Sequence, residues 1–120
     1  QTMIEYAVNY IRMNCSKNIS IRQLARDINY SYDYFRHLFK KQVGMSINKF
    51  IDRERVKYIK KLLSETDYRE KEIADMCDFS SAAHLVKFFK NTTGETPICF
   101  RQRQQQKKDD EYELNELTYR

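Results

Sequence analysis

The sequence predicts an all-α protein, and three observations lead to that prediction. Only two glycines and one proline occur in 120 residues, too few for the tight turns of a β-rich fold. Apolar residues instead recur at the three- and four-residue spacing of amphipathic helices. The second half of the chain also repeats the helical pattern of the first half. We expect about seven helices: one leading, two per copy of the repeat, one connecting and one closing.

The leading helix is predicted by apolar residues at helical spacing, namely Met3, Ile4, Ala7, Val8 and Ile11. In the next helix Ser20 is a typical N-cap, and Gln23, three residues later, completes a capping box. The apolar face of that helix consists of Ile21, Leu24, Ala25 and Ile28.

The break at residues 29–31 predicts a short turn, after which Ser31 caps a further helix. Gly44 is placed to end that helix. Its apolar stripe is Phe35, Leu38, Phe39 and Val43. Ser46 then caps a long connecting helix with the buried stripe Ile47, Phe50, Ile51, Tyr58, Ile59, Leu62 and Leu63. Its other face carries Lys49, Arg53, Lys57, Lys60 and Lys61.

A repeat organises the chain. Residues 35–50 read FRHLFKKQVGMSINKF and residues 85–100 read LVKFFKNTTGETPICF. At an offset of fifty the identical pairs are Phe39 and Phe89, Lys40 and Lys90, Gly44 and Gly94, and Phe50 and Phe100. Upstream the offset is forty-nine, which places one extra residue between the first two helices of the second copy. That copy has the apolar positions Ile73, Ala74, Cys77, Leu85, Phe88 and Phe89, a turn at residues 78–81, and Pro97 at the start of the closing helix.

Composition excludes several classes of protein. Hydrophobic residues make up 41% and charged residues 32% of the chain, an ordinary balance for a globular protein. No apolar run approaches the roughly 18–20 residues of a membrane-spanning helix, and no signal peptide is recognisable. Three dispersed cysteines, an odd count, suit a reducing compartment, so we expect a cytoplasmic protein. The chain begins at Gln1, which suggests a piece of something longer.

Positive charge is segregated along the chain. The formal net charge is +5, but residues 45–63 alone carry six bases and two acids, whereas residues 64–80 carry two bases and six acids. Residues 97–108 are likewise basic and residues 109–120 acidic. Such segregation is typical of a one-sided anion-binding surface.

Each copy of the repeat has the parts of a helix-turn-helix, two short helices joined by a turn of three to four residues. In that motif the first helix supports the second, whose exposed face enters the major groove of B-DNA. The residues of the first candidate recognition helix that lie off its apolar stripe are Tyr32, Asp33, Arg36, His37, Lys40 and Lys41.

With these motifs the chain resembles, over roughly residues 3–103, the DNA-binding domain of AraC/XylS-type transcription regulators. The most specific matches are Ile73-Ala74, Phe79, Phe89-Lys90, Gly94, Thr96-Pro97 and Phe100-Arg101. The resemblance implies two helix-turn-helix subdomains bridged by the long helix, with recognition helices in major-groove segments about 34 Å apart. It also implies an effector-sensing or dimerisation domain N-terminal to this fragment, and contact with RNA polymerase during activation.

Carried over position by position, the resemblance assigns base reading to Asp33, Arg36 and His37 in the first copy and to Ala82, Ala83, Val86 and Lys87 in the second. The expected contacts to the DNA backbone are Ser31, Lys40, Lys41, Lys49, Ser81 and Lys90. Arg36 can bond guanine O6 and N7 together, whereas the alanines and the valine offer only apolar contact. Asp33 either accepts from cytosine or aims Arg36 through an ion pair within the helix. We therefore expect the first copy to supply most of the sequence reading.

Two positions depart from the family pattern. Asp78 stands where the family usually has a glycine, so the turn before the second recognition helix is costlier. Glu70 stands where the first copy has Ile21, which we expect to be buried. Both departures predict a second subdomain that is less stable or adapted to a different surface.

The expected organisation is a first subdomain at 1–46, a connecting helix at 47–64, a second subdomain at 65–104 and a polar tail at 105–120. The tail reads either as disorder or a frayed helix end, or as a short helix using Tyr112, Leu114 and Leu117 against another protein.

Other chemistry has little support in the sequence. The cysteines and the two histidines lack zinc-site spacing, and no nucleophile, phosphate-loop or acidic metal motif is recognisable, so we expect no metal, no cofactor and no enzyme activity. The main alternative to DNA binding is a helical protein-interaction module whose basic faces contact an acidic partner. Absence of duplex binding at low salt would favour that alternative.

Overall fold

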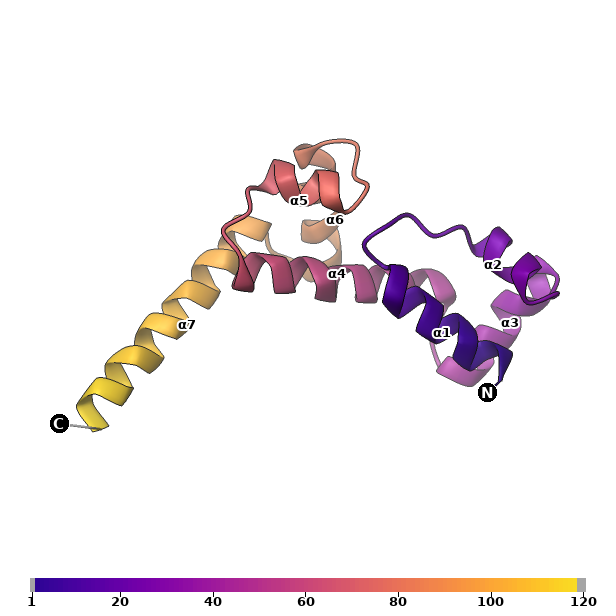
Figure 1. Ribbon diagram of the computed structural model, residues 1–120, viewed down its shortest axis with the longest axis horizontal. Coiled ribbons are helices and arrows are strands. Elements are labelled where there is room, and N and C mark those ends of the chain that lie inside the picture. The colour runs from indigo at the N-terminus through magenta and orange to yellow at the C-terminus, as the bar shows by residue number, and fades with distance from the viewer. Residues whose placement is uncertain (1, 119–120) are drawn as a thin grey trace. The chain divides into compact units, whose positions relative to one another are not determined.

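The computed structural model describes residues 2–118, within which every regular element is a helix. This confirms the all-α prediction. The helices are α1 (Met3–Asn14), α2 (Ile21–Asp27), α3 (Tyr32–Val43), α4 (Ile47–Glu65), α5 (Glu70–Met76), α6 (Ala82–Thr93) and α7 (Pro97–Thr118) (Figure 1).

The repeat is visible in the helix lengths. The first helix of each pair, α2 or α5, has seven residues, and the second, α3 or α6, has twelve. Gly44 and Gly94 end α3 and α6 in the left-handed conformation, with φ of 91° and 87°, which a side chain rarely adopts. Each glycine N–H donates to the carbonyl of the lysine four residues earlier, Lys40 or Lys90.

The chain divides into two compact units. The first unit comprises Gln1–Tyr58 and Met76–Asp78, and the second comprises Ile59–Asp75 and Phe79–Arg120. The connecting helix that we expected as a separate segment at 47–64 therefore contributes its first turns to one unit and its last turns to the other. The segment Met76–Asp78, at the end of α5 and in the turn after it, belongs to the first unit although the rest of α5 belongs to the second.

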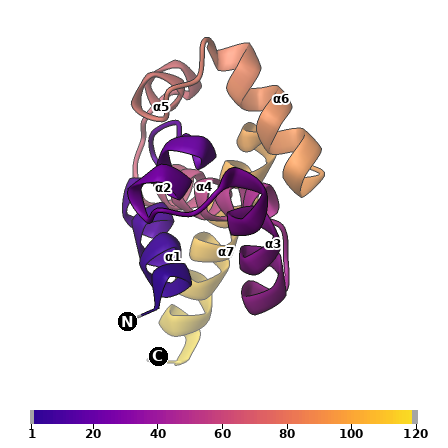
Figure 2. The same cartoon turned by 90° about the vertical axis from the view of Figure 1, so that its right-hand side faces the viewer.

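The core of the first unit is formed by α1, α2 and α3 around the start of α4 (Figures 1 and 2). Phe35 and Phe39 of α3 are completely buried, and the Phe39 ring meets Phe50 of α4 edge to face at 5.5 Å between centroids. Aromatic pairs in this geometry contribute about 0.5–1.5 kcal/mol beyond the burial of their area. α3 is thereby anchored through one face and leaves the other in solvent.

The second unit repeats this arrangement. Phe89 of α6 is completely buried and meets Phe100 of α7 edge to face at 5.9 Å. Ile73, Ala74 and Leu85 are also completely buried. The apolar stripes predicted for both recognition helices are confirmed at their central positions, whereas Leu38 and Val43 are only half-buried.

The predicted capping box is only half formed in the first copy. The Ser20 Oγ accepts the N–H of Gln23, as expected, but the Gln23 side chain donates to Asp27 instead of returning to the start of α2. In the second copy the other half is present, because the Glu72 carboxylate accepts the N–H of Arg69.

Ile21 is half-buried rather than buried, and Glu70 at the matching position of the second copy is half-buried too. The glutamate therefore does not stand at a fully buried position, as the sequence had suggested.

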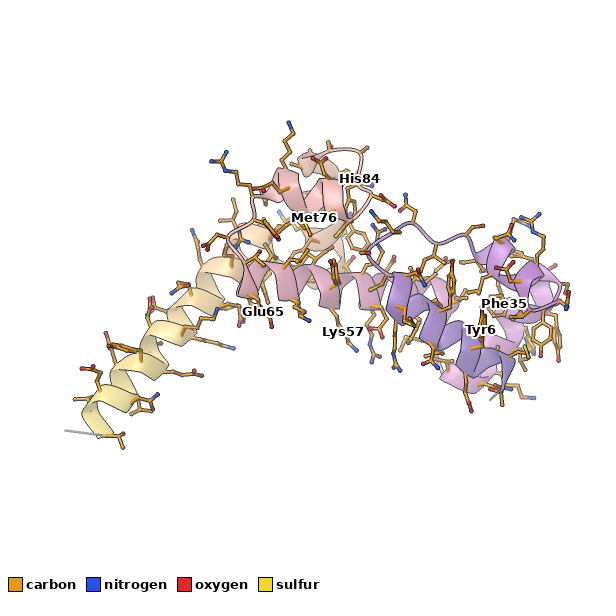
Figure 3. The ribbon with its side chains drawn as sticks, viewed as in Figure 1. Tyr6, Phe35, Lys57, Glu65, Met76 and His84 are labelled. Carbon is orange, nitrogen blue, oxygen red and sulfur yellow. The ribbon has the colours of Figure 1, made fainter. Side chains whose placement is uncertain are left out.

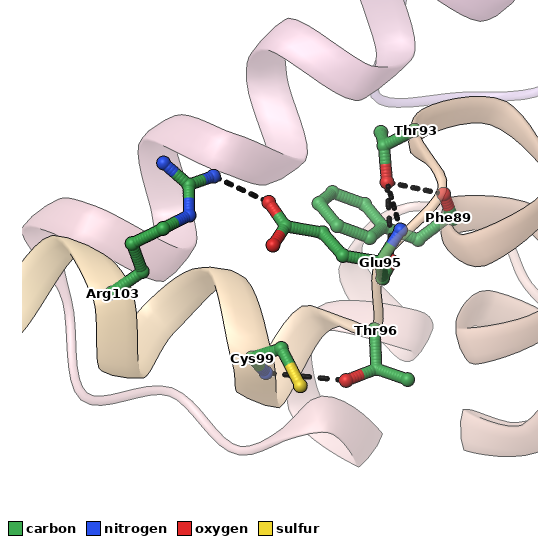
Figure 4. A network of polar contacts seen from close by, with 6 residues as sticks. All are labelled: Phe89, Thr93, Glu95, Thr96, Cys99 and Arg103. Atoms are coloured by element: carbon green, nitrogen blue, oxygen red, sulfur yellow. Dashed lines mark hydrogen bonds and ion pairs between the residues drawn. The ribbon is translucent and has the colours of Figure 1, made fainter.

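The end of α4 is capped by α7. The Arg101 guanidinium donates to the carbonyls of Leu63, Thr66 and Tyr68, and Lys108 donates to that of Ser64. The Leu63 and Ser64 carbonyls are among those that a helix C-terminus leaves without partners, and the Thr66 and Tyr68 carbonyls belong to the segment that follows α4. At the start of α7, Arg103 pairs with Glu95, and the Thr93 hydroxyl bridges the Phe89 carbonyl and the Glu95 backbone (Figure 4).

The residues expected to form a separate tail continue α7 as far as Thr118, with every side chain of 105–118 exposed. Tyr119 and Arg120 lie outside the described residues. Gln105 and Gln106 donate to Asp109 and Asp110 one turn later. Tyr112 and Leu117 border one shallow groove together with Glu113 and Glu116, whereas Leu114, two residues from Tyr112, lies on the opposite side of the helix from it. The three therefore do not form one apolar stripe.

A buried carboxylate, Glu54 in α4, was not anticipated from the sequence. Its side chain is 6% exposed and pairs with Arg12 at 2.9 Å and with Lys57 at 3.3 Å (Figure 3 shows Lys57). Burial acts to raise the pKa of Glu54, but the hydrogen bonds and charges of Arg12 and Lys57 outweigh burial, so the pKa is lowered.

Because its pKa is lowered in the folded state, Glu54 stabilises the protein fully above its unfolded pKa, about 4.5. That contribution is lost as the pH falls through the lower folded value. Glu54→Gln should lower the free energy of unfolding by about 1.5–3 kcal/mol at pH 7, and by progressively less as the pH falls from 5 to 3. Urea unfolding across this range measures the difference, with Glu65→Gln, an exposed carboxylate of the same helix, as the control. A difference independent of pH would contradict the assignment.

Candidate nucleic-acid interface

The exposed face of α3 is the first part of the candidate interface. With Phe35 and Phe39 turned inward, the predicted base-reading residues of this helix lie in solvent. The exposed residues are Asp33, Arg36, His37, Lys40 and Lys41. This face therefore offers a forked donor, an imidazole and two ammonium groups to a ligand.

Arg36 has an aromatic neighbour, Tyr32, that was not predicted from the sequence. Its guanidinium carbon lies 5.2 Å from the centre of the Tyr32 ring, and that of Arg22 in α2 lies 4.0 Å from the same ring. Among the described residues Asp33 and Arg36 form no ion pair, so the aiming contact proposed for Asp33 is absent. The signal in the sequence was the spacing, since Tyr32 precedes Arg36 by one helical turn.

The exposed face of α6 is the second part. Ala83, Lys87 and Lys90 are exposed, whereas Ala82 and Val86 are half-buried. The face has the same position in its helix pair as that of α3 but a different chemistry. Its predicted readers offer methyl groups and one ammonium group, and none of these four side chains bonds two base atoms together.

Both helices begin with a serine cap, of which only Ser31 was predicted. The Ser31 Oγ accepts the N–H of Tyr34 at 3.2 Å, and the Ser81 Oγ accepts the N–H of His84 at 3.1 Å. Each hydroxyl keeps its own hydrogen for another acceptor. Lys49, the remaining predicted backbone contact, is exposed in the first turn of α4.

The extra residue of the second copy lies between its two helices, where the sequence offset placed it. Five residues separate α5 from α6, and four separate α2 from α3. The hydroxyl of Ser80 lies 3.1 Å from Nδ1 of His84, whose ring also packs edge to face on Phe79 (Figure 3 shows His84). His84 is thus held at the surface beside the start of α6.

The turn before each recognition helix uses a left-handed residue that is not glycine. Asn29 has φ of 61° and Asp78 has φ of 59°, and the residue after each donates to an alanine carbonyl, Ala25 or Ala74, at 2.9 Å. The two turns are therefore equivalent, and Asp78 occupies the left-handed position predicted for it.

Further contacts stabilise Asp78 in that position. The Asp78 carboxylate accepts the backbone N–H of Asn18 at 3.0 Å and lies 3.8 Å from the ammonium of Lys17. Just before it, the carbonyl of Cys77 accepts a hydrogen bond from Arg55. All of these residues belong to the first unit. An aspartate thus gains a carboxylate contact that glycine would lack.

The described residues contain no group of three or more metal-ligating side chains. Burial raises the pKa of the Cys15 and Cys77 thiols, which keeps them protonated and poor as ligands or nucleophiles. No helix between residues 2 and 118 is long and apolar enough to cross a membrane.

The fold and the two exposed faces define an all-helical domain with two helix-turn-helix motifs. A family described as a helix-turn-helix domain matches residues 24–103. The chain belongs to this family, in its AraC/XylS-type branch, whose members are the DNA-binding domains of transcription regulators. The predicted family and the predicted class of function are confirmed.

Three relatives illustrate the match. The regulatory protein PocR of Salmonella typhimurium is 31% identical over 96 residues, which are 80% of this chain and 32% of PocR. The C-terminal domain of AraT, a response regulator from Geobacillus stearothermophilus, has a TM-score of 0.80 at 22% identity and 86% coverage of both chains. The DNA-binding domain of AdpA, solved with a target DNA, has a TM-score of 0.77 at 22% identity and covers 86% of this chain and 93% of that one. The chain spans 12–37% of the length of the first curated relatives it matches.

Asp78 provides a test of the turn geometry. Asp78→Ala should destabilise the protein by about 1–3 kcal/mol, because the Asn18 N–H loses its acceptor and alanine tolerates the left-handed region poorly. Asp78→Gly loses the same acceptor but relieves the backbone, so it should be milder than alanine by about 1 kcal/mol. Urea unfolding measures both, with Asp75→Ala on the exposed side of α5 as the control. Equal losses for alanine and glycine would show that backbone strain at residue 78 is negligible.

Proposed function

We propose that this chain binds double-stranded DNA with α3 and α6 in successive major-groove segments. The observation that carries the proposal is that both copies have a twelve-residue helix with one buried side and one exposed side. In each copy one side of a twelve-residue helix is buried, through Phe35 and Phe39 in α3 and through Leu85 and Phe89 in α6. The opposite side, which carries lysines, is exposed. Family membership supports the same use, as does the likeness in fold to the DNA-bound AdpA domain.

Sequence reading is assigned chiefly to α3. Arg36 bonds guanine through O6 and N7, and Asp33 and His37 contact neighbouring base edges. In α6, Lys87 is the polar reader, while Ala82, Ala83 and Val86 contact thymine methyl groups. The first copy therefore supplies most of the specificity.

Affinity is assigned to contacts with the phosphates. Lys40, Lys41 and Lys90 follow the readers along the exposed faces, Lys49 lies at the start of α4, and Ser31 and Ser81 donate their hydroxyl hydrogens. Lysines that neutralise phosphates release counterions, and this makes binding depend strongly on salt.

The complete regulator is proposed to hold more than this domain. Because the chain spans only a minor part of its curated relatives, we assign an effector-sensing or dimerisation domain to the N-terminal side. We further propose that the regulator contacts RNA polymerase, works in the cytoplasm where bacterial DNA lies, and is not itself an enzyme.

Alanine substitution separates the two recognition helices. Arg36→Ala should reduce discrimination between the selected site and single-base variants by about 1–3 kcal/mol at one position, whereas Lys87→Ala should weaken all sequences more evenly. Fluorescence anisotropy on sites selected from a random duplex pool, and on scrambled duplexes, measures this. A larger loss of specificity from Lys87→Ala would overturn the division, and absence of duplex binding at low salt would favour an acidic protein partner.

Salt dependence tests the phosphate contacts. If four lysines each neutralise one phosphate, the slope of log K against log salt is about −3.6, and Lys90→Gln should make it less steep by about 1. Titrations between 50 and 250 mM salt on a scrambled duplex, roughly the range in which such slopes are resolved, provide the measurement. Lys107→Gln, an exposed lysine of α7 outside the assigned set, should leave the slope unchanged. The same change of slope in both variants would refute the assignment.

A further inference from the structure

One contact on the exposed face of the first unit is not explained by packing. The Tyr32 ring, at the first position of α3, lies beside two guanidinium groups, Arg22 at 4.0 Å and Arg36 at 5.2 Å. Both arginines are exposed and Tyr32 is half-buried. Three side chains from two helices are thus gathered at the point where α3 begins.

We propose that Tyr32, supported by Arg22, is a positioning residue that sets the direction of Arg36 and thereby its preference for guanine. This inference rests on the proposed function, because it deepens the role given there to Arg36. Tyr32 acts through Arg36 and need not touch a base itself.

The physical reason begins with the freedom of an exposed arginine. A solvent-exposed arginine samples many rotamers, and ordering such a side chain on binding costs roughly 0.5–1.5 kcal/mol, a factor of about 2 to 10 in affinity. A ring face within about 6 Å attracts a guanidinium and leaves its N–H edge free to donate. Contact with Tyr32 therefore removes part of that ordering cost before DNA arrives.

Arg22 adds a second effect. Two cations beside one ring repel each other, so Arg36 gains by reaching an electronegative acceptor. Guanine presents two acceptors, O6 and N7, on its major-groove edge, whereas adenine presents one acceptor beside a donor. The arrangement therefore favours guanine more strongly than an isolated arginine would.

The second copy provides an internal comparison. At the positions that match Arg22, Tyr32 and Arg36 it has Lys71, Ala82 and Val86. None of these offers a ring or a forked donor. The ring with two neighbouring arginines thus occurs in the copy that has the predicted guanine reader and is missing from the copy that has none.

The test uses Tyr32→Leu, which removes the ring, and Tyr32→Phe, which keeps it. Duplexes are first selected from a random pool with the unmodified chain and with Arg36→Ala, and the position where guanine preference disappears marks the base under Arg36. At that position Tyr32→Leu should reduce discrimination for guanine about 2- to 5-fold, with binding to scrambled duplex unchanged. Tyr32→Phe should retain discrimination, and Arg22→Gln should lose part of it.

A readout without DNA completes the test. Without DNA, the ring current of residue 32 should shift the NMR resonances of the Arg36 δ-protons in the unmodified chain and in Tyr32→Phe. The shift should be absent in Tyr32→Leu. Circular dichroism checks that each variant is folded. Full discrimination in folded Tyr32→Leu, or equal losses in the leucine and phenylalanine variants, would overturn the proposal. If Arg36→Ala leaves every base preference intact, the proposed reading by Arg36 fails instead, and the positioning role fails with it.

Discussion

The edge-to-face contact between a buried phenylalanine of the recognition helix and a phenylalanine of the following helix is the constraint on which each unit depends. Phe39 meets Phe50, and Phe89 meets Phe100, with centroid separations that differ by less than half an ångström. This contact fixes which side of a twelve-residue helix faces inward. The residues on the opposite side are consequently free to diverge, and the two copies have diverged almost completely there.

That division explains how much of the fold could be predicted. Periodicity and the repeat located all seven helices, because buried positions such as Phe35 and Leu85 must recur at helical spacing whatever surrounds them. The serine caps and the left-handed Gly44 and Gly94 were predictable because they depend on local backbone chemistry. The exposure of the proposed readers followed from the same periodicity.

Contacts between distant segments could not be predicted in this way. The pairing of Glu54 with Arg12 joins residues forty-two positions apart, and the capping of α4 by Arg101 joins helices separated by two others. Even within one turn of helix, Arg36 had both Asp33 and Tyr32 in reach, and the ring it lies beside is shared with Arg22 from α2. Local patterns do not encode a partner supplied by another helix.

The order of charges along α7 has a consequence of its own. Bases occupy its first half and acids its exposed second half, which is the reverse of the arrangement that a helix macrodipole favours. The glutamine-to-aspartate bonds one turn apart oppose this penalty. Dissolved ions screen the unfavourable charge–dipole interaction, so rising ionic strength should stabilise this helix while it weakens attraction to phosphates. Salt concentration thus acts in opposite senses on the stability of α7 and on the binding of phosphates by the preceding helices.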